Sequence, residues 1–178
     1  MGADVVDKAA RADLESFVRH RAAALLRYGY VLTGNRHDAA DLTHEALVRV
    51  GAVWPRIVAK GDPQAYVHTT MARLHVSRWR RLRRERLVGR VPERGYSGME
   101  LARIDGDTGL WQALAALPAR QRAVLVLRYY QQRSDEEIAA VLRITRGTVR
   151  SQVARGLAAL RTVWPVQPPA GSTTRGKR

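Results

Sequence analysis

The chain has 178 residues, of which 46% are hydrophobic and 26% charged, and it contains no cysteine. This length suits one ordinary domain or two small ones, and the lack of cysteine excludes disulfides, thiolate zinc sites and a cysteine nucleophile. The formal net charge of +15 makes a polyanion the leading class of partner. We find neither a secretory leader nor an apolar run of the roughly 20 residues that span a bilayer. We therefore expect a cytoplasmic protein without membrane insertion.

The first half shows helical periodicity and almost no strand alternation, which predicts an all-α protein. Residues 1–12 are interpreted as an N-terminal extension. Helices are then expected over 13–32, from a cap at Asn35 or Asp38 to about Trp54, and from Pro63 to about residue 88. The second of these has an apolar stripe formed by Ala39, Leu42, Ala46, Val50 and Val53.

Acidic residues follow one face of that second helix. Asp38, Asp41 and Glu45 recur at positions i, i+3 and i+7. Stabilisation by the helix dipole explains an acidic residue at a helix start, but it explains Glu45 less well. In so basic a chain, we interpret this face as a docking surface for a basic protein partner. The alternative is a metal site that includes His37 and His44, or the Mg²⁺ of a nuclease held by Asp38 and Asp41; no HExxH pattern or strand supports it.

The third predicted helix is strongly basic. Residues 61–90 contain eight arginines against two acidic residues, and the same helix carries Tyr66, His68, His75 and Trp79. Arginines at this density favour contact with phosphates, and the rings favour stacking on unpaired bases. The alternative is a solvated charged face whose rings simply pack in a core.

A change of composition divides the chain into two. Residues 89–108 include four glycines and one proline, which predicts a flexible linker between two small helical domains, 13–88 and 109–164. Residues 165–178 are rich in Pro, Gly, Ser and Thr, and we expect them to be disordered.

The second half contains a predicted helix-turn-helix. Leu110 to Leu117 and Pro118 to Tyr130 are expected to be helical, and Ser134 and Glu137 match a capping box at the start of the next short helix. Thr145 can cap the helix that follows after a short turn, an arrangement typical of helix-turn-helix motifs. The outer face of that last helix is expected to carry small residues and an arginine, with a second arginine, Arg150, at its flank: Gly147, Thr148, Ser151, Ala154, Arg155 and Ala158.

This outer face has the composition of a DNA recognition helix. Small side chains let a helix enter the major groove, and arginine can contact guanine with two hydrogen bonds. Gly147 allows the backbone amides at the helix start to approach a phosphate. The alternative is a helical hairpin with a solvated outer face. We find no catalytic constellation anywhere, and we expect no enzymatic activity, metal, cofactor or small-molecule substrate.

Three segments resemble a known family, the extracytoplasmic-function sigma factors of bacterial RNA polymerase. Region 2 of that family is similar to LTGNRHDAADLTHEALVRV and DPQAYVHTTMARLHVSRWRRLRRE, and region 4 is similar to LWQALAALPARQRAVLVLRYYQQRSDEEIAAVLRITRGTVRSQVARGLAALR. Together the segments cover about residues 13–161. The resemblance implies a protein that binds core RNA polymerase and directs it to promoter DNA to initiate transcription. It also implies that 13–88 is the region 2 domain and 109–164 the region 4 domain.

The resemblance also implies roles for individual residues. The face that docks on the clamp coiled coil of the largest polymerase subunit would be formed by Asp38, Asp41, Leu42 and Glu45. Capture of a flipped base and grip of the −10 element would fall to the loop 57–63, with Lys60 and Asp62, and to His75, Arg78, Trp79, Arg80 and Arg81. The −35 element would be read by Arg150, Ser151, Ala154 and Arg155, with Arg146, Gly147 and Thr148 beside the DNA backbone.

Two points qualify the match. Arg143 stands in the turn where the family often has glycine, and a left-handed backbone there would cost arginine roughly 1 kcal/mol. Many members are held inactive by an anti-sigma factor, but this sequence identifies none. The alternative function is a helix-turn-helix transcriptional regulator that acts without binding polymerase, with residues 1–90 as a sensing or dimerisation module.

Overall fold

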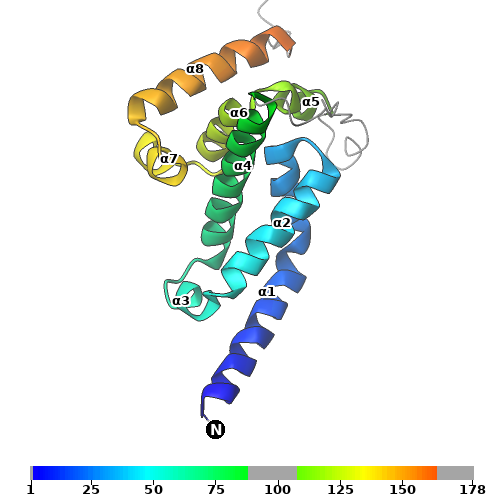
Figure 1. Ribbon diagram of the computed structural model, residues 1–178, viewed down its shortest axis with the longest axis vertical. Helices are drawn as coiled ribbons and strands as arrows, with labels where there is room; N and C mark the ends of the chain where they lie inside the picture. The colour runs from blue at the N-terminus through cyan, green and yellow to red at the C-terminus, as the bar shows by residue number, and fades with distance from the viewer. Residues whose placement is uncertain (1, 88–107, 164–178) are drawn as a thin grey trace, which may run out of the picture.

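The computed structural model in Figure 1 is built from helices alone throughout the part of the chain that it describes. It describes residues 2–87 and 108–163, without the side chains of 2–7, 83–87 and 108. The predicted linker and tail thus lie outside the described residues, apart from Thr108. The elements are α1 (Gly2–Thr33), α2 (Arg36–Gly51), α3 (Trp54–Val58), α4 (Pro63–Leu87), α5 (Thr108–Ala116), α6 (Ala119–Leu125), the π-helical turn η1 (Val126–Tyr130), α7 (Asp135–Leu142) and α8 (Arg146–Val163).

Helix α1 begins earlier than the sequence suggested. We expected a helix from Asp13, but α1 already begins at Gly2 and includes most of the predicted N-terminal extension. Residues 3–12 contain neither proline nor glycine and four of them are alanine, the strongest helix former. In Figure 1 the first turns of α1 extend away from the other helices. We therefore attribute the early start of α1 to the high helix propensity of these residues.

A short helix, α3, occupies a segment that we expected to be a helix end and a loop. Helix α2 stops at Gly51, and Trp54–Val58 forms α3 with Pro55 in its first turn. Trp54 is buried, its ring lies 5.0 Å from that of Phe17, and its Nε1 donates to Asp13 Oδ2 at 3.0 Å. Contacts with α1 thus fix a helix that local sequence did not indicate, and Ile57 and Val58 belong to this helix rather than to the loop.

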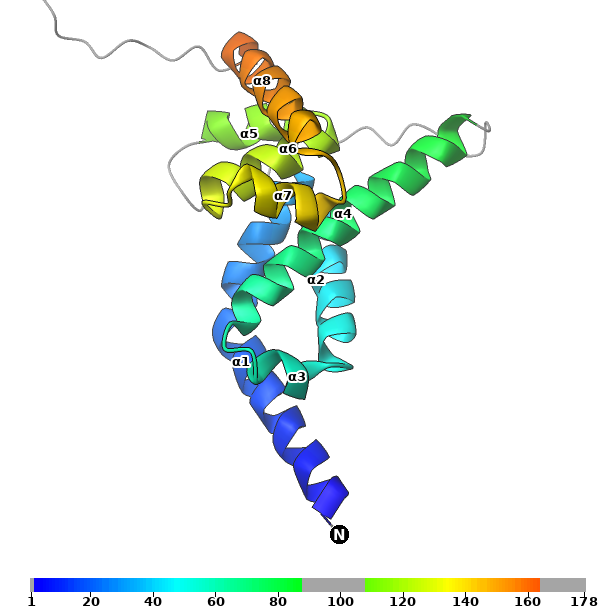
Figure 2. The same cartoon turned by 90° about the vertical axis from the view of Figure 1, so that its left-hand side faces the viewer.

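The two halves of the chain share one apolar core. The cluster joins Leu25 of α1 and Met71 of α4 to Val124, Leu127 and Val149 of the second half. Helix α4 packs against α6 and α7, and α1 packs against α5 and α6. Figure 2 shows the second half seated across the upper parts of α1 and α4. The two predicted domains are therefore closely packed in this conformation.

The turn between α1 and α2 is part of the contact between the halves. Gly34 has a φ of +74°, and a Cβ atom there would lie 2.7 Å from Ala115 Cβ and 2.8 Å from Arg122 Nη1. Arg122 is itself buried, and its Nη2 donates to the carbonyl oxygens of Ala115 at 2.8 Å and Leu117 at 3.1 Å. A side chain at Gly34 would therefore push against the start of the second half.

Gly34→Ala is expected to lower the free energy of unfolding by about 2–4 kcal/mol, because left-handed strain adds to the steric overlap. Gly61 offers a matched control, since its φ is +88° but a Cβ atom there would meet nothing within 4 Å. Gly61→Ala should therefore cost only the backbone strain. Urea denaturation of both variants measures the difference. Equal losses would show that the contact between Gly34 and the second half contributes nothing to stability.

Candidate DNA and protein interfaces

The acidic face of α2 is placed by a cap at its start. The Asn35 side chain accepts hydrogen bonds from the amides of His37 at 2.8 Å and Asp38 at 3.2 Å, which confirms the predicted cap. Asp41 is exposed, whereas Asp38 and Glu45 are half-buried. One expected member of the docking surface is wrong: Leu42 has 0% exposure and lies in the core, so its side chain cannot touch a partner in this conformation.

A hollow beside the acidic residues adds other side chains to this face. A shallow hollow is lined by Asp41, His44, Glu45, Val48, Arg49 and Arg78. Val48 is 62% exposed, the highest value among the exposed large hydrophobic residues of the described part, and it stands one turn beyond His44 and Glu45. Val48 was not among the residues predicted for this face, although its spacing of seven from Asp41 places it on the same side of the helix. The face therefore combines acidic groups with an exposed apolar contact.

Glu45 is already engaged within the chain. Its carboxylate accepts from Arg49 Nη2 at 2.8 Å and pairs with Arg78 of α4. Arg78 Nη2 also donates to the carbonyl oxygen of Asp41 at 3.4 Å. One of the expected DNA-binding arginines is thus held by one of the expected polymerase-binding carboxylates.

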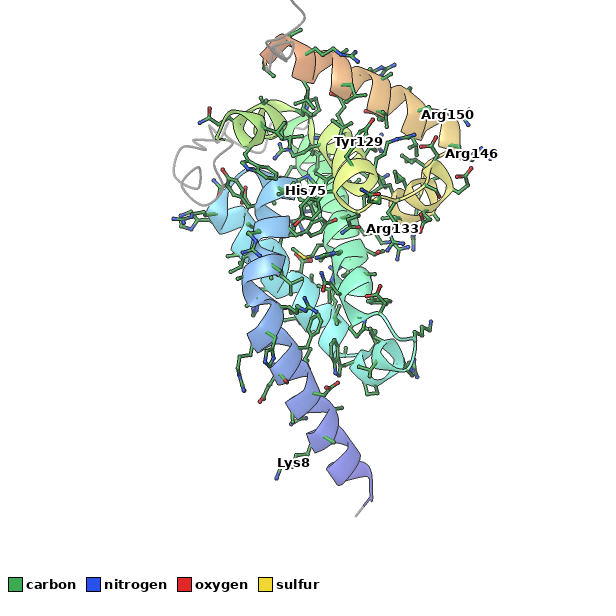
Figure 3. The ribbon with its side chains drawn as sticks, turned by 180° about the vertical axis from the view of Figure 1, so that it is seen from behind. Lys8, His75, Tyr129, Arg133, Arg146 and Arg150 are labelled. Atoms are coloured by element: carbon green, nitrogen blue, oxygen red, sulfur yellow. The ribbon has the colours of Figure 1, made fainter. Side chains whose placement is uncertain are left out.

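Several side chains of α4 contact the second half. Arg73 Nε donates to the carbonyl oxygen of Val141 at 3.0 Å, and Arg80 Nη2 donates to that of Leu142 at 3.3 Å. The guanidinium of Arg120 lies 5.5 Å from the ring centroid of Trp79, and His75 shares a hydrogen bond with the backbone of Ala119. Of the five α4 residues expected to grip the −10 element, Arg81 is exposed here and the other four are half-buried. Figure 3 shows His75 in the interior between the helices.

The loop before α4 is open to solvent. Lys60 and Asp62 are exposed, and Asp62 Oδ1 accepts from the Ala65 amide at 2.9 Å, so Asp62 caps α4. In Figure 1 this loop lies beside α3, at the opposite end of the molecule from α8. The structure therefore places the loop residues Lys60 and Asp62 away from the candidate −35 residues of α8.

Two histidines are neutral at the contact between the halves. Burial lowers the pKa of His68 to about 4, with Arg133 acting in the same direction and Asp62 against it. Burial also lowers the pKa of His75 to about 3; the neighbouring Arg122 and Arg78 add to this, and the hydrogen bond to the Ala119 backbone opposes it. The Nε2 atoms of both rings are buried without a hydrogen-bond partner. The closed arrangement, in which the two halves pack together, thus requires both rings to be uncharged.

The protein is expected to lose stability as the pH falls from about 7 to 5. Both histidines titrate near pH 6.5 when unfolded but at much lower pH when folded, so below pH 6.5 the unfolded chain binds more protons. The loss should reach about 2 kcal/mol per ring at pH 5. Thermal melting at pH 7.5 and 5.0 measures it. His75→Asn, which keeps a donor but does not titrate, should reduce the dependence; an unchanged dependence would contradict this assignment.

The helix-turn-helix has the local geometry that its sequence predicts. A capping box begins α7. The Glu137 amide donates to the Ser134 side chain, and the Ser134 amide donates to the Glu137 carboxylate. These bonds, together with Arg133, hold the pKa of the Glu137 carboxyl below its ordinary value. Arg143 has a φ of 53°, so the position where the family often has glycine is indeed left-handed. Thr145 Oγ1 accepts from the Thr148 amide at 3.1 Å and caps α8.

The outer face of α8 is available, as predicted. Arg146, Gly147, Arg150, Ala154 and Arg155 are exposed, and Thr148 and Ser151 are half-buried. The Ser151 hydroxyl donates to the carbonyl oxygen of Thr148 at 3.0 Å. The two arginines near the start of α8 are each paired with an acidic residue of α7: Arg146 with Glu136 at 2.8 Å and Arg150 with Asp135 at 3.3 Å. Figure 3 shows both beside α7. That this face contacts DNA remains a prediction.

Among the described side chains, those of residues 8–82 and 109–163, no three from histidine or acidic residues come together as a group that could hold a metal ion. No helix in the described part of the chain combines the length and the apolar character needed to cross a membrane.

Two family models match the chain. "Sigma-70 region 2" matches residues 17–85, and "Sigma-70, region 4" matches residues 108–160. The chain is 35% identical over 150 residues to the RNA polymerase sigma-E factor of Streptomyces avermitilis, which covers 84% of this chain and 83% of that protein. It is 32% identical over 149 residues to the ECF RNA polymerase sigma factor SigL of Mycobacterium tuberculosis, covering 79% of this chain and 82% of that one.

A solved structure shares the fold. The sigma factor RpoE of Bartonella quintana, in complex with the anti-sigma factor NepR, matches with a TM-score of 0.61 and 22% sequence identity. The match covers 88% of this chain and 99% of that one.

Proposed function

The chain belongs to the sigma-70 family, as an extracytoplasmic-function sigma factor. We propose that three of its surfaces have separate roles in transcription initiation. The acidic face of α2 docks on core RNA polymerase, α4 and the loop before it engage the −10 element, and the outer face of α8 reads the −35 element. The observation that carries the proposal is the order of two matched regions, 17–85 and 108–160, which end in an exposed helix-turn-helix.

The charge and shape of the two exposed faces support this assignment of polymerase binding to α2 and −35 recognition to α8. The face of α2 presents Asp41 and Val48 to solvent in a strongly cationic chain, a combination suited to a basic protein surface with an apolar patch. The face of α8 presents arginines between small residues, which suits the major groove. Both surfaces are accessible in the structure, on different helices.

The −10 contacts require a change of arrangement. His75, Trp79 and Arg80 lie against the second half, and Arg78 is paired with Glu45. His75, Trp79 and Arg80 reach DNA only if α6 and α7 move away from α4, and Arg78 only if it leaves Glu45. We therefore propose that the second half separates from the first when the protein binds polymerase and promoter.

This role places the protein in the cytoplasm, where polymerase and chromosomal DNA are. It needs no catalytic group of the chain's own, because the polymerase performs the chemistry. A regulator that acts without core polymerase is not favoured, since relatives that match most of this chain carry sigma-factor names. By analogy with the relative bound to NepR, an anti-sigma factor is a further expected partner.

Reconstitution with bacterial core RNA polymerase tests the proposal. The full chain is expected to bind core polymerase at one to one and to start transcription from a subset of fragments in a GC-rich genomic library. The new promoters should share −35 and −10 elements at a fixed spacing. DNA binding without any association with polymerase would overturn the proposal in favour of a plain regulator.

Arg155→Ala is expected to cost about 1–3 kcal/mol of promoter binding at one base pair of the −35 element, if the guanidinium contacts a base with two hydrogen bonds. The readout is competition between −35 variants in transcription with core polymerase. Arg21→Ala, on the exposed side of α1, makes the same change of charge away from this face; as the control, it should leave the ranking of promoters unaltered. A uniform loss over all −35 variants would reassign Arg155 to the phosphate backbone.

A further inference from the structure

The first residue of α7 connects three elements through its carboxylate. Asp135 Oδ1 accepts from Arg128 Nη1 of η1, and Oδ2 accepts from Arg150 Nε of α8 at 3.3 Å. The side chain of Asp135 is only 13% exposed, whereas that of Arg150 is 65% exposed. A largely buried carboxylate therefore binds Nε of an arginine whose side chain is mostly exposed.

The atoms used in this pairing matter for recognition. Arginine has five N–H donors in a rigid fork. Asp135 binds Nε, the side chain of Arg150 is 65% exposed, and its described hydrogen bond does not use the two terminal Nη groups. These are the donors that match O6 and N7 of guanine in the major groove. The pairing thus leaves free the part of the side chain that can distinguish bases.

Arg128 fixes the carboxylate in turn. With one oxygen bound to Arg128 and the other to Arg150, Asp135 cannot rotate without losing a charged hydrogen bond. The neighbouring ion pair of α7 and α8 is not fixed by a second arginine among the described contacts. Glu136 and Arg146 are both more than half exposed, at 58% and 57%, and the pair has no third charged group beside it among the described contacts. Glu136 therefore provides a matched comparison from the same helix.

We propose that Asp135 is a positioning residue for −35 recognition, which holds Arg150 so that its terminal fork reads one guanine. The inference rests on the proposed role of α8. Prior restriction of a flexible side chain reduces the entropy lost on binding, and it also limits which base edge the side chain can reach. Loss of Asp135 should therefore affect base preference more than overall affinity.

The test measures transcription by the full chain with core polymerase from a promoter library in which the −35 element is randomised. Arg150→Ala identifies the position at which guanine preference disappears. Asp135→Asn should reduce guanine preference at that same position by about fivefold to tenfold, within the range expected for one bidentate contact, and leave the other positions unchanged. Glu136→Gln should leave every position unchanged. In the double variant, Asp135→Asn should have no further effect once Arg150 is alanine.

The outcomes separate the inference from its premise. If Arg150→Ala changes no position, the proposed reading by this arginine fails. If Arg150→Ala changes one position but Asp135→Asn lowers all promoters equally, or changes nothing, Asp135 does not position Arg150 and the inference is overturned. Should Asp135→Asn lower the melting temperature markedly, Asp135→Ser, which keeps a residue suited to a helix start, replaces it in the same assay.

Discussion

Reversal of two charges on α2, Asp41→Arg with Glu45→Arg, is expected to weaken binding to core RNA polymerase by about 100-fold or more. Like charges brought together at an interface cost several kcal/mol, and two reversed residues would face a basic partner. Asp41 is exposed, and Val48 extends the same surface, so the change falls at the centre of the proposed docking face. Titration of labelled variant against core polymerase measures the affinity.

The single variant Asp41→Arg is needed beside the double one. Glu45 also holds Arg78, so its reversal disturbs the contact between α2 and α4 as well as the surface. Asp41 contributes only its backbone oxygen to that contact. Asp41→Arg alone should therefore weaken binding without changing the melting temperature, and Glu15→Arg, on the exposed side of α1, gives the same change of charge elsewhere. Equal effects of the two single variants would mean that net charge, and not this face, governs binding.

Features encoded by neighbouring residues could be predicted from the sequence. The cap at Asn35, the capping box of Ser134 and Glu137, and the turn before Thr145 each depend on residues within four positions of one another. The exposed face of α8 followed from helical spacing alone. Even the left-handed Arg143 could be expected, because a two-helix motif with so short a turn needs such a residue at the end of its first helix.

Features that depend on distant residues could not be predicted in this way. The bonds from Arg73 to Val141 and from Arg80 to Leu142 join positions 68 and 62 apart in sequence. Leu42 fitted both the apolar stripe and the family's docking segment, and only the packing of α1, α2 and α4 decides that it belongs to the core. Helix α3 likewise depends on Asp13 and Phe17 as partners for Trp54. Periodicity identifies apolar faces, but it does not say which faces meet.

Covalent closure of α4 against α7 is expected to reduce promoter-dependent transcription at least tenfold, because a side chain buried against α7 cannot also contact phosphates. Ser77 is exposed and lies one turn from both Arg73 and Arg80, and Arg143 is exposed directly after Leu142. The chain has no cysteine of its own. Ser77→Cys with Arg143→Cys can therefore be joined by a cleavable thiol reagent that spans about 10 Å, the usual separation of packed helix axes.

Cleavage of the reagent supplies the decisive comparison, since it restores freedom of movement while every substitution remains. Transcription should return to the level of the untreated double variant, and each single-cysteine variant should be unaffected by the reagent. Polymerase binding is measured in parallel. If the cross-linked protein still binds polymerase but does not start transcription, the closed arrangement blocks the DNA step alone, as the burial of His75 and the bonds of Arg80 imply. Full transcription by the cross-linked protein would show that α4 reaches the −10 element without separation of the two halves.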